Sequence, residues 1–231
     1  KLMGTISFSL VKGSNHITTA EDYAFDTKEI REYILGEKEY KGDVKWAFLT
    51  FDDGPNTSVT VDILDILQEE NVPATFFVVG TSVIEKHRDV LRRQVNEGHA
   101  LALHSYSHNY QYMYPGRSGN VANIANEVTK SQEALQAILG KDFHSGVWRY
   151  PGGHMSWNNL EPADEKLASL GVEWIDWNSL SGDAEPKNRR PTTVSGLVEF
   201  TNKTIKQNDN QDIVVVLMHD AANKELTVQA L

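Results

Sequence analysis

The sequence predicts a parallel α/β fold, and two patterns indicate it. Short apolar runs rich in β-branched and aromatic residues alternate with stretches in which apolar residues recur every three to four positions. The six runs that we expect to be strands are Trp46–Thr50, Ala74–Val79, His99–Leu103, Gly146–Arg149, Val172–Trp177 and Ile213–Met218. Strands that alternate with helices in this way are typical of a sheet whose strands all run parallel.

Five helices are expected between these strands, and a shorter one before them. The five cover residues 63–70, 84–95, 121–139, 160–170 and 194–205, and the shorter one covers Thr27–Leu35. Gly140 follows the third and is expected to be its left-handed cap. Residues 1–44 carry scattered charge and polar pieces, so we interpret them as an N-terminal extension or linker before one main domain at 45–231.

The composition excludes several classes of protein. The 231 residues carry 22 Lys and Arg against 32 Asp and Glu, a formal net charge of −10, and they include no Cys. Nucleic-acid binders draw much of their affinity from basic residues on phosphates, so we expect no nucleic-acid partner. The apolar runs are far shorter than the ~20 residues that cross a bilayer, so we expect no membrane span. The chain begins with Lys1, which favours a fragment of a longer protein from which a targeting segment was removed.

Ionisable residues stand at or just after the ends of five of the six expected strands. They are Asp52 and Asp53, His104 and His108, Arg149, Asp176 with Asp183 shortly after it, and His219. Each group alone is a weak signal, because Asp-Asp-Gly-Pro is a common turn and a His after an apolar strand is as often a core residue. The C-terminal ends of parallel strands lie on one face of the fold, so the combination predicts a single site there.

This combination favours metal-assisted hydrolysis. Asp53, His104 and His108 offer one carboxylate and two imidazoles, a set that leaves open positions on a Zn²⁺-like ion. Asp52 is then the candidate general base and His219 the candidate general acid.

Two further residues are expected to support the site. Arg149 is expected to pair with one of the carboxylates and to hold its pKa low. Gly152, in a Pro-Gly-Gly turn, offers a backbone N–H to an oxyanion.

Four motifs resemble those of carbohydrate esterase family 4, the polysaccharide deacetylases with a NodB homology domain. They are Thr-Phe-Asp-Asp-Gly-Pro at Thr50–Pro55, His-Ser-x-x-His at His104–His108, Arg-x-Pro at Arg149–Pro151 and Leu-x-His at Leu217–His219. The resemblance covers about residues 45–231. It implies a distorted (β/α) barrel with parallel strands, and a catalytic domain that removes acetyl groups from N-acetylated sugars with the help of a divalent metal.

The resemblance also implies roles for single residues. Asp52 would be the base, His219 the acid and Arg149 the partner that orients Asp52, while Asp53, His104 and His108 would hold the metal. Zn²⁺ is favoured, with Co²⁺, Ni²⁺ and Mn²⁺ as alternatives. Residues in or beside the motifs are expected to contact substrate, namely Tyr150, Pro151, Gly152, Trp177 and Leu217.

The sequence departs from the family pattern after the fifth expected strand. The family's Asp-x-x-Asp-Trp motif aligns with Leu180–Ala184, which retains only Asp183. Either Asp183 or Asp176 could therefore support His219, and Asp176-Trp177 could take over the missing part.

The third motif ends in Gly-Gly and resembles that of Gram-positive cell-wall deacetylases. This favours peptidoglycan as substrate and an extracellular or cell-surface location in a bacterium. The alternatives are a deacetylase of chitooligosaccharide or acetylxylan, a non-catalytic sugar-binding domain on the same scaffold, and a glycosidase that uses two carboxylates. No protein partner is inferred.

Overall fold

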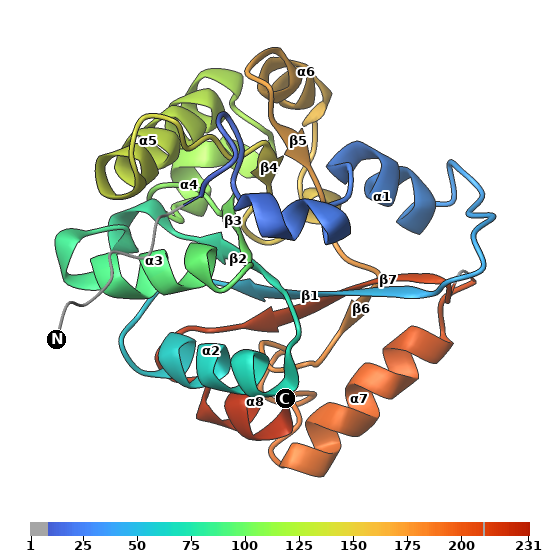
Figure 1. The fold of residues 1–231 in the computed structure, drawn as a ribbon. Helices are drawn as coiled ribbons and strands as arrows, with labels where there is room; N and C mark the ends of the chain where they lie inside the picture. Colours follow the sequence, from blue (N-terminus) through green and yellow to red (C-terminus); the bar gives the residue numbers. More distant parts are fainter. Residues whose placement is uncertain (1–8, 210) are drawn as a thin grey trace, which may run out of the picture.

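The computed structural model describes residues 9–209 and 211–231. Seven strands form one sheet in the order β5-β4-β3-β2-β1-β7-β6, and all six neighbouring pairs are parallel. The strands are β1 Trp46–Asp52, β2 Thr75–Val78, β3 Ala100–Leu103, β4 Val147–Trp148, β5 Glu173–Trp174, β6 Ser179–Leu180 and β7 Ile213–His219. The sheet curls and is surrounded by helices (Figure 1). The parallel α/β barrel expected from the sequence is confirmed.

Eight α-helices accompany the sheet in the described residues. They are α1 Thr27–Ile34, α2 Val59–Glu70, α3 Arg88–Asn96, α4 Tyr110–Met113, α5 Val121–Leu139, α6 Glu161–Ser169, α7 Val194–Lys206 and α8 Glu225–Ala230. All six expected helices are present. The sequence did not predict α4, α8 and β6, because elements of two to six residues are too short to show a hydrophobic period. No helix among the described residues has the length and hydropathy to cross a membrane.

Two details of the expected helices were wrong. The helix expected from residue 84 begins only at Arg88, and Ile84 is exposed before it. Gly140 ends α5 with a positive φ of 104°, which glycine adopts readily, but its ψ of 162° lies outside the left-handed helical region, so it is not the left-handed cap that we expected.

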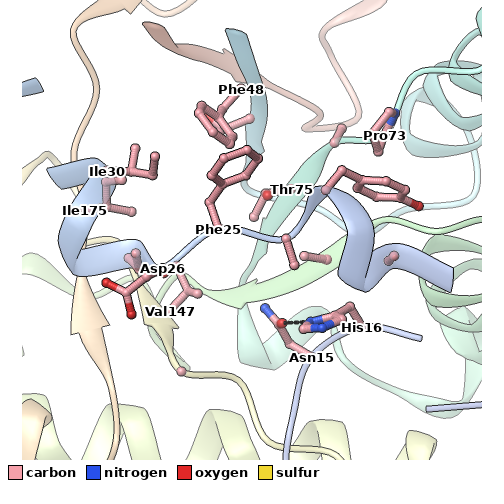
Figure 2. A pocket seen from close by; sticks show the side chains of 18 of the residues that line it. Asn15, His16, Phe25, Asp26, Ile30, Phe48, Pro73, Thr75, Val147 and Ile175 are labelled. Carbon is pink, nitrogen blue, oxygen red and sulfur yellow. Dashed lines mark hydrogen bonds between the residues drawn. The ribbon is translucent and has the colours of Figure 1, made fainter. Parts of the chain in front are cut away.

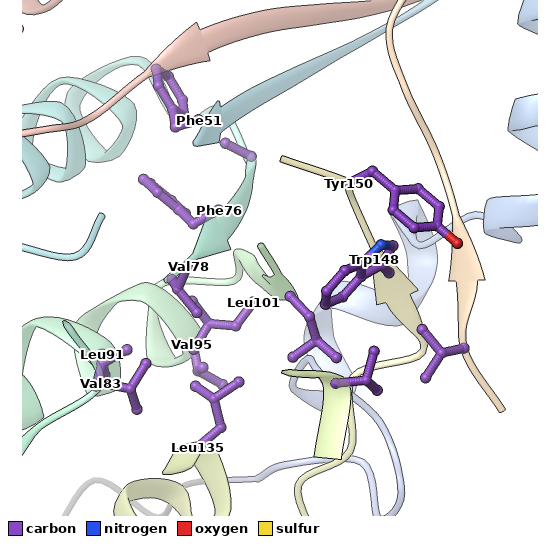
Figure 3. Close-up of a cluster of buried hydrophobic side chains, with 14 of the residues drawn as sticks. Phe51, Phe76, Val78, Val83, Leu91, Val95, Leu101, Leu135, Trp148 and Tyr150 are labelled. Carbon is purple, nitrogen blue, oxygen red and sulfur yellow. The ribbon is translucent and has the colours of Figure 1, made fainter. Parts of the chain in front are cut away.

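The main core lies between the sheet and its helices. Side chains from neighbouring strands, including Phe51, Phe76, Leu101 and Trp148, pack there against helix residues such as Leu135 (Figure 3). Successive residues of a strand point to opposite faces, so residues between these, such as Phe77, face the inside of the curl and form a second cluster. Because both faces are buried, the strands are apolar almost throughout.

The described part of the expected N-terminal extension packs onto the sheet. Ile17 and Ala20 are buried in the main core, and the Asn15 side chain donates a hydrogen bond to the Leu101 carbonyl (3.0 Å). Helix α1 contacts both β5 and β7, so it spans the open side of the curled sheet (Figure 1). Residues 1–8 lie outside the described residues, and the domain boundary at residue 45 stays a prediction.

A cavity of about 600 Å³ lies between this N-terminal segment and the inner face of the sheet. Its lining is largely apolar, with Phe25, Ile30 and Phe48 among the side chains that surround it (Figure 2). Thr50 and Arg149 also line it, on the side toward the C-terminal ends of the strands. The inside of the curled sheet therefore has two ends. One end is apolar and is closed by the N-terminal segment, and the other, beyond Arg149, carries the ionisable residues.

Candidate functional site

A cleft of about 310 Å³ opens at the C-terminal ends of the strands, and most of the predicted site residues meet in it. Asp52 and His219 are paired in register on the adjacent strands β1 and β7. The loop after β1 contributes Asp53, and the loop after β3 contributes His104 and His108. The parallel sheet thus brings together side chains from three distant parts of the sequence.

Asp53, His104 and His108 form a compact donor set, with one ligand atom of each lying within 4.8 Å of the others. Oδ1 of Asp53 is 3.5 Å from Nε2 of His104 and 3.4 Å from Nε2 of His108. This oxygen is buried and has no hydrogen-bond partner among the described residues. A buried carboxylate oxygen without a partner is unfavourable unless a cation satisfies it.

The protonation of His104 suits a metal ligand. Its Nδ1 lies 2.9 Å from the Arg149 carbonyl, which can only accept, so Nδ1 carries the proton and Nε2 carries the lone pair. Burial lowers the pKa of His104 to about 3, so the ring is neutral at physiological pH. One carboxylate and two imidazoles in this arrangement fit a divalent cation of the zinc type.

The backbone around these ligands adopts positive φ values, and a residue outside the motifs stabilises it. Asp53, Ser105 and His108 have positive φ values of 84°, 63° and 54°, a region that non-glycine residues seldom occupy. Glu127 of α5 stabilises the His104–His108 loop, because its Oε2 accepts from the N–H of Tyr106 (2.8 Å) and from the N–H and hydroxyl of Ser107 (2.7 and 3.0 Å).

Glu127 is a residue that our sequence analysis missed. It is only 2% exposed although it is charged. The signal was present, since Glu127 stands between Ile124 and Val128 in the apolar stripe of α5, where a carboxylate is unexpected unless it has specific partners.

Asp220, directly after His219, is a second buried carboxylate that our sequence analysis missed. Its carboxylate accepts from the Gly54 N–H (2.9 Å) and the Thr60 hydroxyl (2.7 Å), and burial raises its pKa to about 7. A Cβ added to Gly54 would lie only 2.2 Å from Asp220 Oδ2, so the loop after Asp53 needs glycine here.

Arg149 pairs with Asp52, as expected. Its Nη1 donates to Asp52 Oδ1 (2.8 Å) and to the Thr50 hydroxyl (2.8 Å), and its Nε and Nη2 donate to the carbonyls of Ile175 and Asp176. The expected consequence for the pKa was wrong, however. Burial raises the pKa of Asp52 above its usual value, and Arg149 opposes this rise without cancelling it, because Asp52 is almost completely removed from water.

His219 is paired with Asp183 at the other side of the cleft. Nδ1 of His219 lies 2.8 Å from Asp183 Oδ1, and the His219 N–H donates to Asp183 Oδ2 (2.9 Å). Burial lowers the pKa of His219, but its hydrogen bond to Asp183 and the negative charge of Asp183 outweigh burial and raise the pKa above the usual value. Burial alone would raise the pKa of Asp183. The hydrogen bonds that Asp183 accepts from His219 and Thr227 and the charge of His219 outweigh burial, so the pKa of Asp183 is lowered.

Asp176 is not the partner of His219, which decides between the two candidates. Its carboxylate accepts instead from the backbone N–H groups of His154 (2.9 Å) and Met155 (3.3 Å), in the turn after Gly153. Asp183 reaches His219 because β6, the strand that the sequence did not predict, pairs with β7 and carries the chain to its C-terminal end.

The expected substrate contacts divide into two groups. Gly152, Trp177 and Leu217 line the cleft. Tyr150 and Pro151 do not, and this part of the expectation was wrong: the Tyr150 side chain is fully buried and its hydroxyl donates a hydrogen bond to Asp164 (2.8 Å), and Pro151, in the turn itself, is buried too. Tyr150 is directed into the core because side chains alternate along β4 and its extension.

This fold and this site together define a parallel α/β barrel of the hydrolase type, with a carboxylate and two histidines on one side of the cleft and a histidine–carboxylate pair on the other. The profile of the polysaccharide deacetylase family matches residues 39–173. The chain belongs to this family.

Several known proteins are similar to the chain. A peptidoglycan-N-acetylglucosamine deacetylase of Bacillus cereus is 33% identical over 160 residues, which are 68% of this chain and 55% of the relative. A chitooligosaccharide deacetylase of Bradyrhizobium is 50% identical over 206 residues, 82% of this chain and 84% of the relative. A Streptococcus mutans CE4 esterase of known structure superposes with a TM-score of 0.91 at 46% identity, covering 96% of this chain and 91% of the other. The chain thus spans about half the length of the Bacillus cereus relative.

Proposed function

We propose that the chain is a divalent-metal-dependent N-deacetylase that acts on the amino sugars of peptidoglycan. The observation that carries this is the composition of the cleft. A donor set of Asp53, His104 and His108, in which the His104 ring is neutral, lies beside a buried carboxylate, Asp52, and opposite an imidazole, His219, whose pKa is raised. Metal-assisted hydrolysis of an amide uses these three elements together: the metal polarises the carbonyl, one group accepts a proton from water and another gives a proton to the amine.

Asp53, His104 and His108 would hold the metal, and their oxygen and nitrogen atoms favour Zn²⁺, with Co²⁺, Ni²⁺ and Mn²⁺ as alternatives. When bound, such an ion supplies Lewis-acid polarisation of the acetyl carbonyl and makes water more acidic.

Two residues of the chain, Asp52 and His219, would then carry out the proton transfers. Asp52 accepts a proton from the attacking water, and its raised pKa makes it a stronger base than an ordinary aspartate. Arg149 is a positioning residue that fixes the Asp52 carboxylate by its hydrogen bond. His219, protonated and held through Nδ1 by Asp183, gives its Nε2 proton to the nitrogen as the C–N bond breaks, and acetate and a free amine result.

The walls of the cleft would bind the substrate. The exposed Gly152 in the turn after β4 offers its N–H to the developing oxyanion, and Trp177 and Leu217 offer apolar surface to the acetyl methyl group.

Peptidoglycan is favoured as the substrate by the Gly-Gly ending of the third motif and by the Bacillus cereus relative, whose name gives that activity. An extracellular or cell-surface location in a bacterium follows from this substrate as part of the proposal. Chitooligosaccharide is the second candidate, because the Bradyrhizobium relative carries that name, and acetylxylan is a third. A purely sugar-binding domain is disfavoured, since binding alone needs neither Asp52 nor His219.

An assay of acetate release tests this proposal directly. Purified peptidoglycan, N-acetylglucosamine oligomers and acetylxylan are incubated with the protein before and after chelation, and again after Zn²⁺ is restored. We expect acetate from peptidoglycan, loss of activity with the chelator and recovery with metal. New reducing ends without acetate would instead indicate a glycosidase, and binding without any product would indicate a sugar-binding domain.

A further inference from the structure

Tyr110 is a large aromatic residue at the edge of the cleft, and it is 42% exposed. Its ring centroid lies 5.3 Å from that of His108, with the two planes inclined by 39°. On another side Trp157 meets it edge to face, with 5.2 Å between centroids. The ring therefore extends the wall of the cleft outward from the donor set.

The position of this ring is fixed by its surroundings. Tyr110 is the first residue of α4, and the Asn109 side chain before it caps this short helix by accepting the N–H of Tyr112 (3.1 Å). Met113, at the other end of α4, is completely buried, and its carbonyl accepts from the Asn120 N–H (2.9 Å). Because α4 is anchored at both ends, a ligand that contacts Tyr110 would not have to order it, and this favours affinity.

Tyr110 and Trp177 both line the cleft, as does Gly152 in the turn after β4. Trp177 approaches this turn closely, since a Cβ added to Gly153 would lie 2.8 Å from its ring. The volume of about 310 Å³ between these groups is at the lower end of the ~300–1,000 Å³ of ligand pockets. A cleft of this volume has room for about one sugar ring, and Tyr110 is one of the residues that line it.

We propose that Tyr110 is a substrate-contact residue whose exposed ring stacks on the C–H face of a pyranose ring of the polysaccharide. The inference rests on the proposed function and specifies how the substrate is held. A pyranose presents C–H groups on its faces and hydroxyl groups at its edges. The faces of aromatic rings carry negative potential that attracts such C–H hydrogens, and stacking also removes apolar surface of both partners from water.

The phenol hydroxyl serves this role as well. It makes no hydrogen bond to another residue in the described part of the chain, so it is available to an edge hydroxyl of the sugar.

Tyr112 provides a matched control in the same helix. It is 36% exposed and also a tyrosine, but its hydroxyl accepts a hydrogen bond from the Asn126 side chain (3.0 Å), and it does not line the cleft.

The test compares Tyr110→Ala, Tyr110→Phe and Tyr112→Ala. KM and kcat are measured on N-acetylglucosamine oligomers and on a small activated acetyl ester, the oligomer dissociation constant is measured by calorimetry, and bound metal is measured by elemental analysis. We expect Tyr110→Ala to weaken oligomer binding and raise KM roughly 5- to 50-fold, a loss of the size found when a ring that stacks on a nucleic-acid base is removed. The loss in kcat/KM should be much smaller on the ester, Tyr110→Phe should keep most of the affinity, and Tyr112→Ala should match the wild type.

Unchanged oligomer affinity in Tyr110→Ala would overturn the inference. A fall in bound metal with parallel losses on both substrates would also overturn it, because Tyr110 would then be a support for His108. The proposed function can fail separately, since a wild type that binds oligomers but releases no acetate would refute the deacetylase while the calorimetry still tests Tyr110. A wild type that binds no oligomer would refute the stacking role itself.

Discussion

His104 and His219 occupy comparable places in the fold, yet the pKa values of their imidazoles are shifted in opposite directions. Each stands at the C-terminal end of a buried strand, His104 directly after β3 and His219 as the last residue of β7, and each uses Nδ1 for a hydrogen bond of 2.8–2.9 Å. The pKa of His104 is lowered to about 3 by burial, whereas the pKa of His219 is raised because its bond to Asp183 and the charge of Asp183 outweigh burial. The difference lies in the acceptor, which is a neutral carbonyl for His104 and a carboxylate for His219. The acceptor at Nδ1 therefore makes one histidine suited to hold a cation and the other suited to donate a proton.

Among the variants that test this difference between the two histidines, His104→Ala should have the largest effect. It removes one of three metal donors, so we expect bound metal to fall severely and turnover to be abolished. Elemental analysis of the purified variant checks this, with His87→Ala as the control, since His87 bonds to a carbonyl at the surface. Wild-type metal content in His104→Ala would refute the assignment of the donor set.

His219→Ala tests the other half of the comparison. Loss of the general acid should lower kcat on an N-acetyl substrate by about 10²–10⁴-fold, a barrier increase of ~3–5 kcal/mol, because an amine leaves poorly unless it is protonated. Bound metal and KM should change little, and an activated acetyl ester should lose far less activity.

Two results would contradict the role of His219. Equal losses on amide and ester in a folded variant would refute the general acid. Loss of both activities together with a fall in Tm would mean that His219 serves the stability of the last strand.

Arg149 links the site to the interior of the barrel and is expected to affect both activity and stability. It is fully buried, so Arg149→Ala leaves Asp52 as an unpaired buried carboxylate and should destabilise the fold by ~3–5 kcal/mol. The charge of Arg149 lowers the pKa of Asp52, so its removal raises that pKa further and moves the acidic limb of the pH–rate profile to higher pH. Arg149→Lys keeps the charge and should move the limb less. An unmoved limb at the wild-type rate in a folded Arg149→Ala would refute the pairing.

Glu127 should influence metal binding by His104 and His108 through the loop that carries them. Glu127→Ala removes three hydrogen bonds from the His104–His108 loop, so we expect metal affinity to fall about 10- to 100-fold, as for other residues that orient ligands. Gln132→Ala is the control, because Gln132 is a buried polar residue of the same helix that holds Ser145 instead. Equal metal affinities in the two variants would show that Glu127 serves only the fold.

Asp183→Asn is the most conservative substitution that tests the pairing of His219 with Asp183, and we expect the smallest effect from it. The variant keeps the shape of the side chain but removes the negative charge that stabilises the His219 imidazolium. The pKa of His219 should then fall, the acid should lose its proton at lower pH, and the alkaline limb of the pH–rate profile should move to lower pH. Asp176→Asn is the control, since Asp176 bonds to backbone N–H groups and not to His219. A shift of the same size in both variants would refute the specific pairing.

The sequence by itself determined the features that depend on neighbouring residues. The apolar runs located six strands of the sheet, and helical periodicity located α2, α3, α5, α6 and α7. The motifs placed Asp53, His104 and His108 where parallel strands must bring them together. These features follow from local sequence because strand alternation, helical period and loop position after a strand are set within a few residues.

The tertiary structure alone decided the features that depend on distant contacts. Only the pairing of β6 with β7 shows that Asp183, and not Asp176, reaches His219. Burial of Asp52 raises its pKa in spite of Arg149, and Glu127 supports a loop about twenty residues away in the sequence. Burial and hydrogen bonding across the fold depend on how separate elements pack, and the residue types and spacings of one segment do not contain that information.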